Sequence, residues 1–171
     1  DESLNAPDAS LTVGVCAGSR QVCDGLGGWV DPDFGDINRY EAAEVTCDAR
    51  DNDCDGATDE DLEPPAATLN VGVCDGLIKV CRGQQGFVDP VFNNVDGYEP
   101  GNEASCDGRD NDCDGQIDEQ NPGGGGNCDT DADGVCADGR RQCSNGALEC
   151  RQIHQAGNEA CNNRDDDCDG R

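Results

Sequence analysis

The sequence contains few of the residues that build a hydrophobic core. Leu, Ile, Val and Phe together account for 26 of the 171 residues, and there are three Phe, two Tyr and one Trp. Burial of so little apolar surface cannot offset the cost of ordering the chain, which is about 1.5 kcal/mol per residue. With a formal net charge of -27, this composition is otherwise typical of disorder. An ordinary packed interior is therefore excluded.

Basic residues, histidine and long apolar runs are also scarce. Eleven Lys and Arg stand against 38 Asp and Glu, which argues against nucleic acid as a partner. No apolar run approaches the ~18 residues that span a bilayer, so we expect no membrane span. The single histidine, His154, cannot supply a nucleophile, a base and an orienting group, so we expect no enzyme. No basic and apolar leader follows Asp1, so we expect a mature chain or an excerpt.

The sequence is rich instead in cysteine and in acidic residues. Fourteen Cys in so small and acidic a chain predict a disulfide scaffold formed in an oxidising compartment, and hence an extracellular protein. The carboxylates would repel one another in a compact state unless cations entered it. We therefore expect a small, disulfide-rich and mostly irregular fold, with short β-hairpins, little helix, and calcium-binding loops in tandem repeats.

The chain repeats itself with a period of about 58 residues in its first two copies. The acidic motif at residues 47–56 recurs at 106–115 and, in divergent form, at 161–170. Each repeat is predicted to open with a hairpin, formed by residues 13–16 and 21–23 in the first copy and by 71–74 and 79–81 in the second. The predicted organisation is the tail of a preceding acidic loop (1–10), repeat 1 (11–68), repeat 2 (69–121), a Gly-rich linker (122–127) and a divergent repeat 3 (128–171).

Two complete acidic loops carry Asp at alternate positions followed by Gly, as in EF-hand loops. We predict calcium ligands at loop positions 1, 3, 5, 9 and 10, and from the carbonyl at position 7. In the first loop these residues are Asp51, Asp53, Asp55, Ala57, Asp59 and Glu60, and in the second they are Asp110, Asp112, Asp114, Gln116, Asp118 and Glu119. Position 12 lacks the usual Glu, so the upstream Glu44 and Glu103 are alternatives to Glu60 and Glu119. The flanks lack helical periodicity, so we expect the loop without paired helices.

Two further loops have the same spacing but are less complete. In the third loop the predicted ligands are Asp165, Asp167, Asp169 and the carbonyl of Arg171, and those of a fourth loop are Asp129, Asp131, Asp133, the carbonyl of Val135, and Asp138. The third loop stops after its first half, whereas Asp1 and Glu2 align with the second half of a loop. The chain is therefore expected either to be cut from a longer array or to complete its loops head to tail with other copies. A head-to-tail contact that does not close generates a filament.

The spacing of the cysteines favours local disulfides. Six pairs have six residues between partners: Cys16/Cys23, Cys47/Cys54, Cys74/Cys81, Cys106/Cys113, Cys136/Cys143 and Cys161/Cys168. Cys128 and Cys150 lie outside this pattern and are both absent from the other repeats, so we predict that they bond to each other. Zinc is the alternative role for so many cysteines, but its Cys-x-x-Cys spacing does not occur.

The acidic motifs, together with the Asp-Glu pairs that follow the first two, resemble the MopE-type cysteine-rich metal-binding repeats of bacterial surface proteins. The likeness is close for residues 106–119, nearly as close for 47–60 and partial for 161–170. It implies secretion to the bacterial cell surface and metal binding, and it gives a ligand role to the first three Asp of each complete loop. The named member of the family binds copper, but loops that offer only oxygen suit calcium better.

Three functions are compatible with these features. The leading hypothesis is a calcium-rigidified, disulfide-linked subunit or segment of an extracellular fibre, with other copies of the chain as partners. The second is a monomeric adhesion module whose exposed aromatic residues contact a glycan or another surface partner. The third is capture of a metal such as copper.

Overall fold

The computed structural model describes residues 5–171, so Asp1 and Glu2 lie outside the described residues. The chain forms two compact units, one made of Asp1–Ala67 with Ile78–Pro90 and the other of Thr68–Leu77 with Val91–Arg171. Residues 78–90, which belong to the second sequence repeat, are therefore part of the first compact unit. Residues 5–171 contain no apolar helix of membrane-spanning length.

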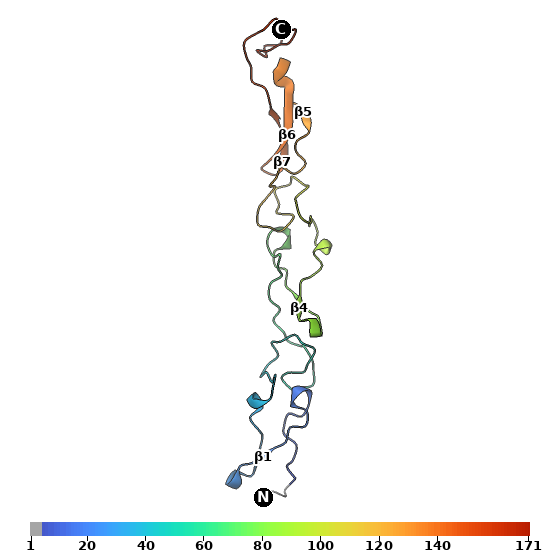
Figure 1. Ribbon diagram of the computed structural model, residues 1–171, viewed down its shortest axis with the longest axis vertical. Coiled ribbons are helices and arrows are strands. Elements are labelled where there is room, and N and C mark those ends of the chain that lie inside the picture. Colours follow the sequence, from blue (N-terminus) through green and yellow to red (C-terminus); the bar gives the residue numbers. More distant parts are fainter. Residues whose placement is uncertain (1–4) are drawn as a thin grey trace. The chain divides into compact units, whose positions relative to one another are not determined.

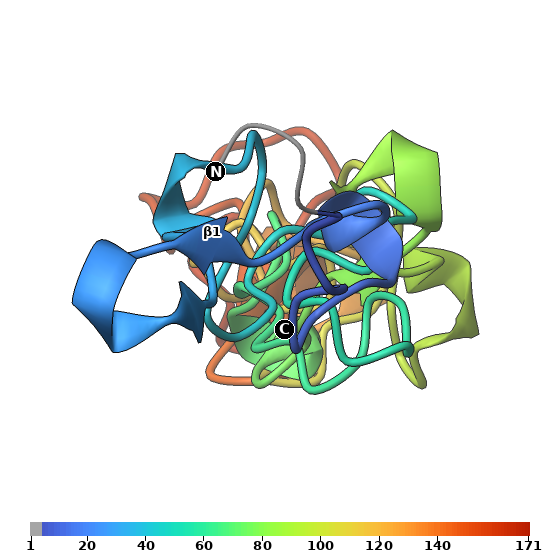
Figure 2. The ribbon, with the colours of Figure 1, turned by 90° about the horizontal axis from the view of Figure 1, so that it is seen from below.

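Regular structure in the first unit consists of two-residue strands and single-turn 3-10 helices (Figure 1). Strand β1 (Val22–Cys23), which is also labelled in the end-on view of Figure 2, pairs antiparallel with β2 (Trp29–Val30), and β3 (Val80–Cys81) pairs with β4 (Phe87–Val88). In both pairs the cysteine lies opposite an aromatic residue, Trp29 or Phe87. The helices of this unit are η1 (Gly14–Cys16), η2 (Gly25–Gly27), η3 (Phe34–Asp36) and η5 (Gly83–Gln85).

The second unit contains the longer strands. Strands β5 (Asn127–Asp129), β6 (Asp138–Ser144) and β7 (Ala147–Gln152) form an antiparallel sheet in that order, with a tight turn at Asn145 and Gly146. Its helices are η4 (Gly72–Cys74), η6 (Phe92–Asn94) and η7 (Gly134–Ala137). The predicted class, a disulfide-rich and mostly irregular fold with short antiparallel strands, is confirmed.

One part of the predicted hairpins is wrong, because residues 14–16 and 72–74 form 3-10 turns rather than strands. Gly14 and Gly72 have φ of 55° and 58°, in the left-handed region that favours glycine. A Cβ at Gly14 would lie 2.2 Å from the carbonyl oxygen of Asp51. The missing side chain lets the turn approach the acidic loop, where the Val15 N–H donates to that same carbonyl at 2.9 Å.

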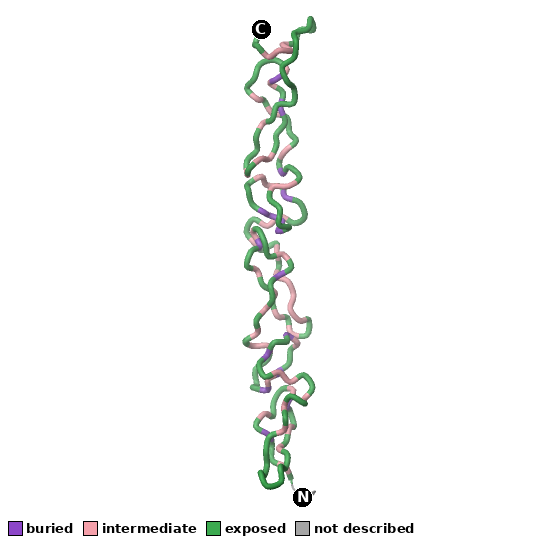
Figure 3. The backbone as a smooth tube through the Cα atoms, turned by 90° about the vertical axis from the view of Figure 1, so that its left-hand side faces the viewer, coloured by how far each residue is buried: buried purple, intermediate pink, exposed green. Residues whose placement is uncertain are grey.

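Cysteines form most of the buried apolar residues. The buried apolar residues are Cys16, Cys47, Cys54, Cys74, Cys113 and Cys136, together with Ala9 and Ala67. Exposed residues dominate the rest of the backbone in Figure 3. The rings of Phe34 and Tyr40 lie 5.8 Å apart and are only half-buried, and Trp29 is exposed. The disulfides therefore occupy the place of a hydrophobic core.

The predicted local disulfides are wrong, and only the Cys128–Cys150 bond is confirmed. The first hairpin cysteine of a repeat bonds to the second cysteine of its acidic motif, and the first cysteine of a motif bonds to the second hairpin cysteine of the next repeat. The first type comprises Cys16–Cys54, Cys74–Cys113 and Cys136–Cys168, and the second comprises Cys47–Cys81 and Cys106–Cys143. Cys23 and Cys161 are free thiols.

The docking of the 3-10 turns on the acidic loops explains this pairing of the cysteines. Because the Val15 and Val73 N–H groups donate to the carbonyls of Asp51 and Asp110, each turn is held against an acidic loop. The Cα of Cys16 then lies 5.8 Å from that of Cys54, within the range that a disulfide spans. Cys54 itself adopts a left-handed backbone, with φ of 65°.

Candidate metal sites

The first acidic loop folds around its own carboxylates. Asp51 accepts backbone hydrogen bonds from Asp55 and Gly56, both at 3.1 Å, and Asp53 accepts a second one from Asp55 at 3.3 Å. Ligand oxygens of Asp51, Asp53 and Asp55 all lie within 4.8 Å of one another. The loop thus brings together three of the predicted ligands. The predicted carbonyl ligand, Ala57, donates its N–H to Asp55 Oδ1 at 2.8 Å.

Two glutamates complete this group of carboxylates. Glu44 is buried and accepts the Asn52 N–H through Oε1 at 2.8 Å, while its Oε2 has no hydrogen-bond partner. Glu60 Oε2 is likewise buried without a partner. Oxygens of Glu44, Asp53 and Glu60 lie within 4.8 Å of one another. The sequence left Glu44 and Glu60 as alternatives, and the structure brings both to Asp53. We call the five carboxylates of Glu44, Asp51, Asp53, Asp55 and Glu60 site 1.

The second repeat builds the same arrangement, which we call site 2. Its carboxylates are those of Glu103, Asp110, Asp112, Asp114 and Glu119. Glu103 accepts the Asn111 N–H through Oε1, and its oxygens lie within 4.8 Å of those of Asp110 and Asp112, all three residues being buried. Gln116, which was predicted to contribute a carbonyl, donates its N–H and its Nε2 to the carboxylate of Asp114.

Among residues 5–171, every buried polar side-chain atom that lacks a hydrogen-bond partner is an oxygen. These atoms are Glu44 Oε2, Asp48 Oδ1, Asn52 Oδ1, Glu60 Oε2, Glu103 Oε2, Asn111 Oδ1 and both carboxylate oxygens of Glu119. Buried polar atoms are nearly always satisfied, and an unpaired buried acceptor is costly. A bound cation satisfies several such oxygens at once, so the donor set of both sites fits a metal ion.

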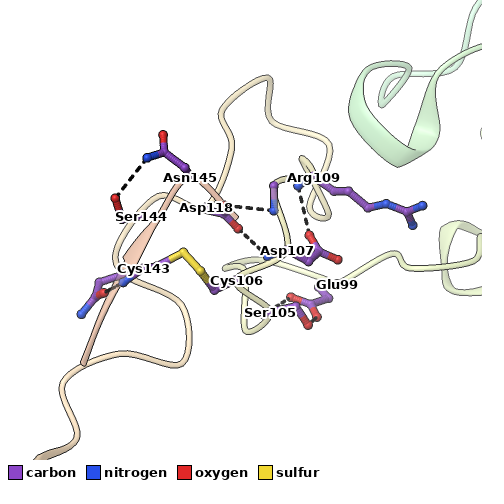
Figure 4. Close-up of a disulfide and its surroundings, with 11 residues drawn as sticks. Glu99, Ser105, Cys106, Asp107, Arg109, Asp118, Cys143, Ser144 and Asn145 are labelled. Carbon is purple, nitrogen blue, oxygen red and sulfur yellow. Dashed lines mark hydrogen bonds between the residues drawn. A yellow bond between two sulfur atoms is a disulfide. The ribbon is translucent and has the colours of Figure 1, made fainter. Parts of the chain in front are cut away.

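Asp59 and Asp118 accept backbone N–H groups at the start of their own motifs. Asp59 accepts the backbone N–H groups of Asp48 and Ala49 at 2.9–3.1 Å, and Asp118 accepts those of Asp107 and Gly108 at 3.0 Å. In Figure 4, Asp118 lies beside the Cys106–Cys143 disulfide. The sequence predicted both residues as ligands at position 9, and the structure gives them a capping contact at the disulfide.

The third acidic loop has the same front half. Asp165 accepts the N–H groups of Asp169 and Gly170, and Asp167 also accepts that of Asp169. Glu159 takes the position of Glu44 and accepts the N–H groups of Asp166 and Asp167. Arg171 lines an open groove with Asp165 and Cys161.

The residues predicted as ligands in the fourth loop take part in several separate contacts. Asp129 and Asp138 lie opposite each other in strands β5 and β6. Asp131 donates its N–H to Asp129 Oδ1, and Val135 donates its N–H to the carbonyl of Asp165 at 3.0 Å. An Oδ2 of Asp133 lies 3.1 Å from where a Cβ on Gly170 would be. Asp133 therefore belongs to the surroundings of the third loop.

Sequence reasoning missed two kinds of supporting residue. Asn52 and Asn111 are almost fully buried, and their backbone groups join each loop to the preceding segment. Glu99 accepts the N–H groups of Ala104 and Ser105, and Glu41 does the same for Val45 and Thr46. The repeated Tyr-Glu pair at residues 40–41 and 98–99 was the signal that could have found these glutamates.

Burial and like charge act together on the glutamates of the sites. Desolvation raises the pKa of Glu44, Glu60 and Glu103 above the ordinary value of 4.5, and nearby carboxylates raise it further. Among the neighbouring carboxylates, Glu119 raises the pKa of Glu103 most. Desolvation followed by repulsion from Asp169 raises the pKa of Asp167 in the third loop. Without a cation, the folded chain therefore holds protons at these groups more tightly than the unfolded chain does.

In metal-free buffer we expect the chain to become more stable as the pH falls from 7 toward 4.5. A pKa raised on folding gives a contribution to stability that is present below the ordinary value and is lost as the pH rises through the raised value. Thermal melts across this range in chelator-treated buffer measure it. Glu103→Gln, which cannot ionise, should flatten the dependence, and a stability that falls with acid from pH 7 would contradict the assignment. Below 4.5 the trend should reverse, because hydrogen bonds from Ser105 and Ala104 lower the pKa of Glu99.

The comparisons agree with these three loops. A family model for Cu-binding MopE, described as "Putative metal-binding motif", matches residues 38–60, 96–119 and 150–171. The chain carries three MopE-type motifs. Each complete motif contains every carboxylate of site 1 or site 2. No curated protein and no solved structure matches the chain.

The three MopE-type motifs and the six disulfides establish the general character of the protein. It is a disulfide-rich tandem-repeat protein with metal-binding motifs. Disulfides in this number are typical of proteins that fold outside the cytosol. The sulfurs of Cys47, Cys81, Cys106 and Cys143 lie near acidic oxygens but are bonded in the Cys47–Cys81 and Cys106–Cys143 disulfides, so the donor atoms that sites 1 and 2 offer are oxygens.

Proposed function

We propose that this protein is an extracellular structural repeat protein whose sites 1 and 2 bind calcium, and that it forms part of a bacterial surface fibre. The observation that supports the metal most strongly is the set of buried oxygens without partners at Glu44, Glu60, Glu103 and Glu119. Each belongs to a group of five carboxylates in a chain with a net charge of -27. Cations at these groups remove the repulsion that opposes the compact state.

The donor atoms favour calcium over copper. Calcium takes six to eight oxygen ligands and tolerates irregular geometry, whereas copper prefers nitrogen and sulfur. Sites 1 and 2 supply carboxylates, the single histidine is exposed, and their nearest cysteines are bonded in disulfides. The family name points to copper, so a direct comparison of the two metals decides between them.

The position of the disulfides relative to the acidic loops supports the structural role. Asp51 and Asp53 of site 1 lie between Cys47, which bonds to a later strand, and Cys54, which bonds to an earlier 3-10 turn, and Asp55 follows Cys54 directly. Because the segment is held by covalent bonds just before the loop and within it, less conformational freedom remains to be lost when a cation binds. Such a chain gains rigidity from bonds and ions, which suits a fibre or stalk outside the cell.

Calcium titration of the purified, oxidised chain tests the metal assignment. We expect the double variant Glu44→Gln and Glu103→Gln to weaken calcium binding at sites 1 and 2 by about tenfold or more, because each site loses a buried charged ligand. Glu63→Gln, at an exposed glutamate outside both sites, is the matched control and should bind like the unmodified chain. The measurement is isothermal titration with calcium and, in parallel, with copper(II).

Two results would count against calcium. One is copper binding that is tight and unaffected by the double variant, together with no heat from calcium. The other is equal calcium affinity in the double variant and in Glu63→Gln, which would place the ions elsewhere in the chain.

A further inference from the structure

The disulfides that join successive repeats follow one rule. The first cysteine of an acidic motif bonds to the second hairpin cysteine of the next repeat, as in Cys47–Cys81 and Cys106–Cys143. The Cα atoms are 5.7 Å apart in both bonds. Each hairpin cysteine also occupies the same place in its strand pair, since Cys81 lies opposite Phe87 and Cys143 lies opposite Leu148.

Both bonds sit within a packed contact between two turns. A Cβ at Gly83, just after Cys81, would lie 3.1 Å from the Cβ of Ala49. A Cβ at Gly146 would lie 2.9 Å from the backbone nitrogen of Gly108. The turn after the hairpin cysteine therefore packs on the turn after the motif cysteine, and Asp59 or Asp118 caps the motif turn from inside the contact.

Cys23 and Cys161 occupy these same two positions without a bond. Cys23 lies in β1 opposite Trp29, as Cys81 lies opposite Phe87, and Cys161 is the first cysteine of the third motif. Both are exposed free thiols. Among the described residues, nothing lies within 4 Å of a Cβ built on Gly25, the counterpart of Gly83. The face that is covered after Cys81 is thus open after Cys23.

The turn after Cys161 is also uncovered, and it corresponds to the other partner of the turn-on-turn contact. Cys161 lines a groove with Asn162, Asn163 and Arg171. Asn162 and Asn163 correspond to Asp48 and Ala49, whose N–H groups are capped by Asp59. In the part of the chain that the structure describes, the Asn162 N–H donates instead to the carbonyl of Ala160, and no carboxylate caps this turn.

We propose that Cys161 of one copy forms a disulfide with Cys23 of a second copy, by the same turn-on-turn contact that joins the repeats within the chain. A second copy also carries the missing cap in its sequence, because Asp1 precedes Cys23 by the same 22 residues that separate Asp59 from Cys81. This inference deepens the fibre part of the proposed function by naming the partner and the bond, and it does not depend on the identity of the metal.

The bond forms by oxidation of two thiols. A disulfide reagent accepts two electrons and two protons from the Cys161 and Cys23 thiols, and is itself reduced to two thiols while one new S–S bond forms. Thiolate attack proceeds through a mixed disulfide, which needs an accessible sulfur. Both sulfurs meet that need because both residues are exposed.

A complementation experiment tests the pairing. The purified chain, incubated with oxidised glutathione, should give a ladder of covalent oligomers on a non-reducing denaturing gel. Cys23→Ser and Cys161→Ser should each stay monomeric alone, and an equal mixture of the two should give one dimer. Mass spectrometry of that dimer should show the Cys161 peptide joined to the Cys23 peptide. Dimers that form as readily in each variant alone, or an oxidised chain that stays monomeric, would overturn the proposal.

Material from the native source separates a second copy from a further repeat of a longer polypeptide. A native Cys161 peptide joined to the Cys23 peptide supports a second copy, whereas one joined to a peptide outside this sequence overturns it. Calcium titration of Cys161→Ser keeps the two proposals apart. Normal calcium binding in Cys161→Ser, together with no ladder of oligomers from the unmodified chain, would reject the disulfide alone. A ladder from the unmodified chain, together with no calcium binding, would reject the metal assignment alone.

Discussion

Removal of calcium by EGTA is expected to lower the thermal unfolding midpoint of the oxidised chain by about 10–20 °C. Two sites filled at about 100 times their Kd contribute roughly 5 kcal/mol of free energy of unfolding. For a chain of this length each kcal/mol corresponds to about 2–4 °C. The apolar interior offers little to compensate, because the buried apolar residues among residues 5–171 are six cysteines and two alanines. Circular dichroism melts with and without EGTA, at constant ionic strength and intact disulfides, measure the effect.

The controls for this experiment separate specific binding from general screening. Readdition of calcium should restore the midpoint, whereas an equal ionic strength of sodium chloride should restore only a small part of it, since screening reduces repulsion but leaves the buried oxygens unpaired. The Glu44→Gln and Glu103→Gln double variant should respond weakly to EGTA. An unchanged midpoint and unchanged protease resistance in EGTA would contradict the proposed role of calcium.

The acidic residues of the sites could be predicted from sequence more fully than their arrangement. Alternating Asp followed by Gly was enough to place Asp51, Asp53 and Asp55 together. The sequence could not choose between Glu44 and Glu60. One residue precedes Asp53 in the chain and the other follows it, and the sequence does not show that both side chains lie beside Asp53. The capping contact of Asp59 was hidden for a related reason. It lies beside the Cys47–Cys81 bond, which brings a later segment against the turn after Cys47.

The regular spacing of the cysteines could not reveal which of them are bonded to each other. A spacing of six residues recurs within every hairpin and every motif, so it fits pairing within each element and pairing between elements equally well. The deciding contact is the docking of residues 14–16 on the carbonyl of Asp51, which requires the left-handed backbone of Gly14. A hairpin strand was the more ordinary prediction for residues 13–16. Cys128 and Cys150 could be paired from sequence because they alone break the repeat.

The disulfide pairing also links successive repeats to one another. Residues 78–90 belong to the second repeat in sequence but to the first compact unit in space, and Cys81 fixes them there. Repeats 2 and 3 thus each supply a hairpin that covers the acidic motif before it. Because a motif is completed by the repeat that follows, a single repeat has an open face. Successive repeats are thus joined by disulfides in a chain with few apolar residues.

Loss of the Cys74–Cys113 bond should be the most costly substitution in the second unit. Replacing both cysteines by Ser opens a link between residues 39 apart, which is worth roughly 4 kcal/mol on the chain-entropy model. Cys74 and Cys113 are also almost fully buried, so the change also places hydroxyl groups in the interior. Urea unfolding in saturating calcium measures the loss.

Cys23→Ser is the informative control for this loss, measured on the monomeric fraction. If the disulfides were local, Cys23→Ser would break a bond to Cys16 and cost several kcal/mol. In the observed register Cys23 is an exposed free thiol, so its replacement should change the free energy of unfolding by less than about 0.5 kcal/mol. A large loss from Cys23→Ser together with a small one from the Cys74 and Cys113 double variant would overturn the register, and with it the pairing of Cys161 with a second copy.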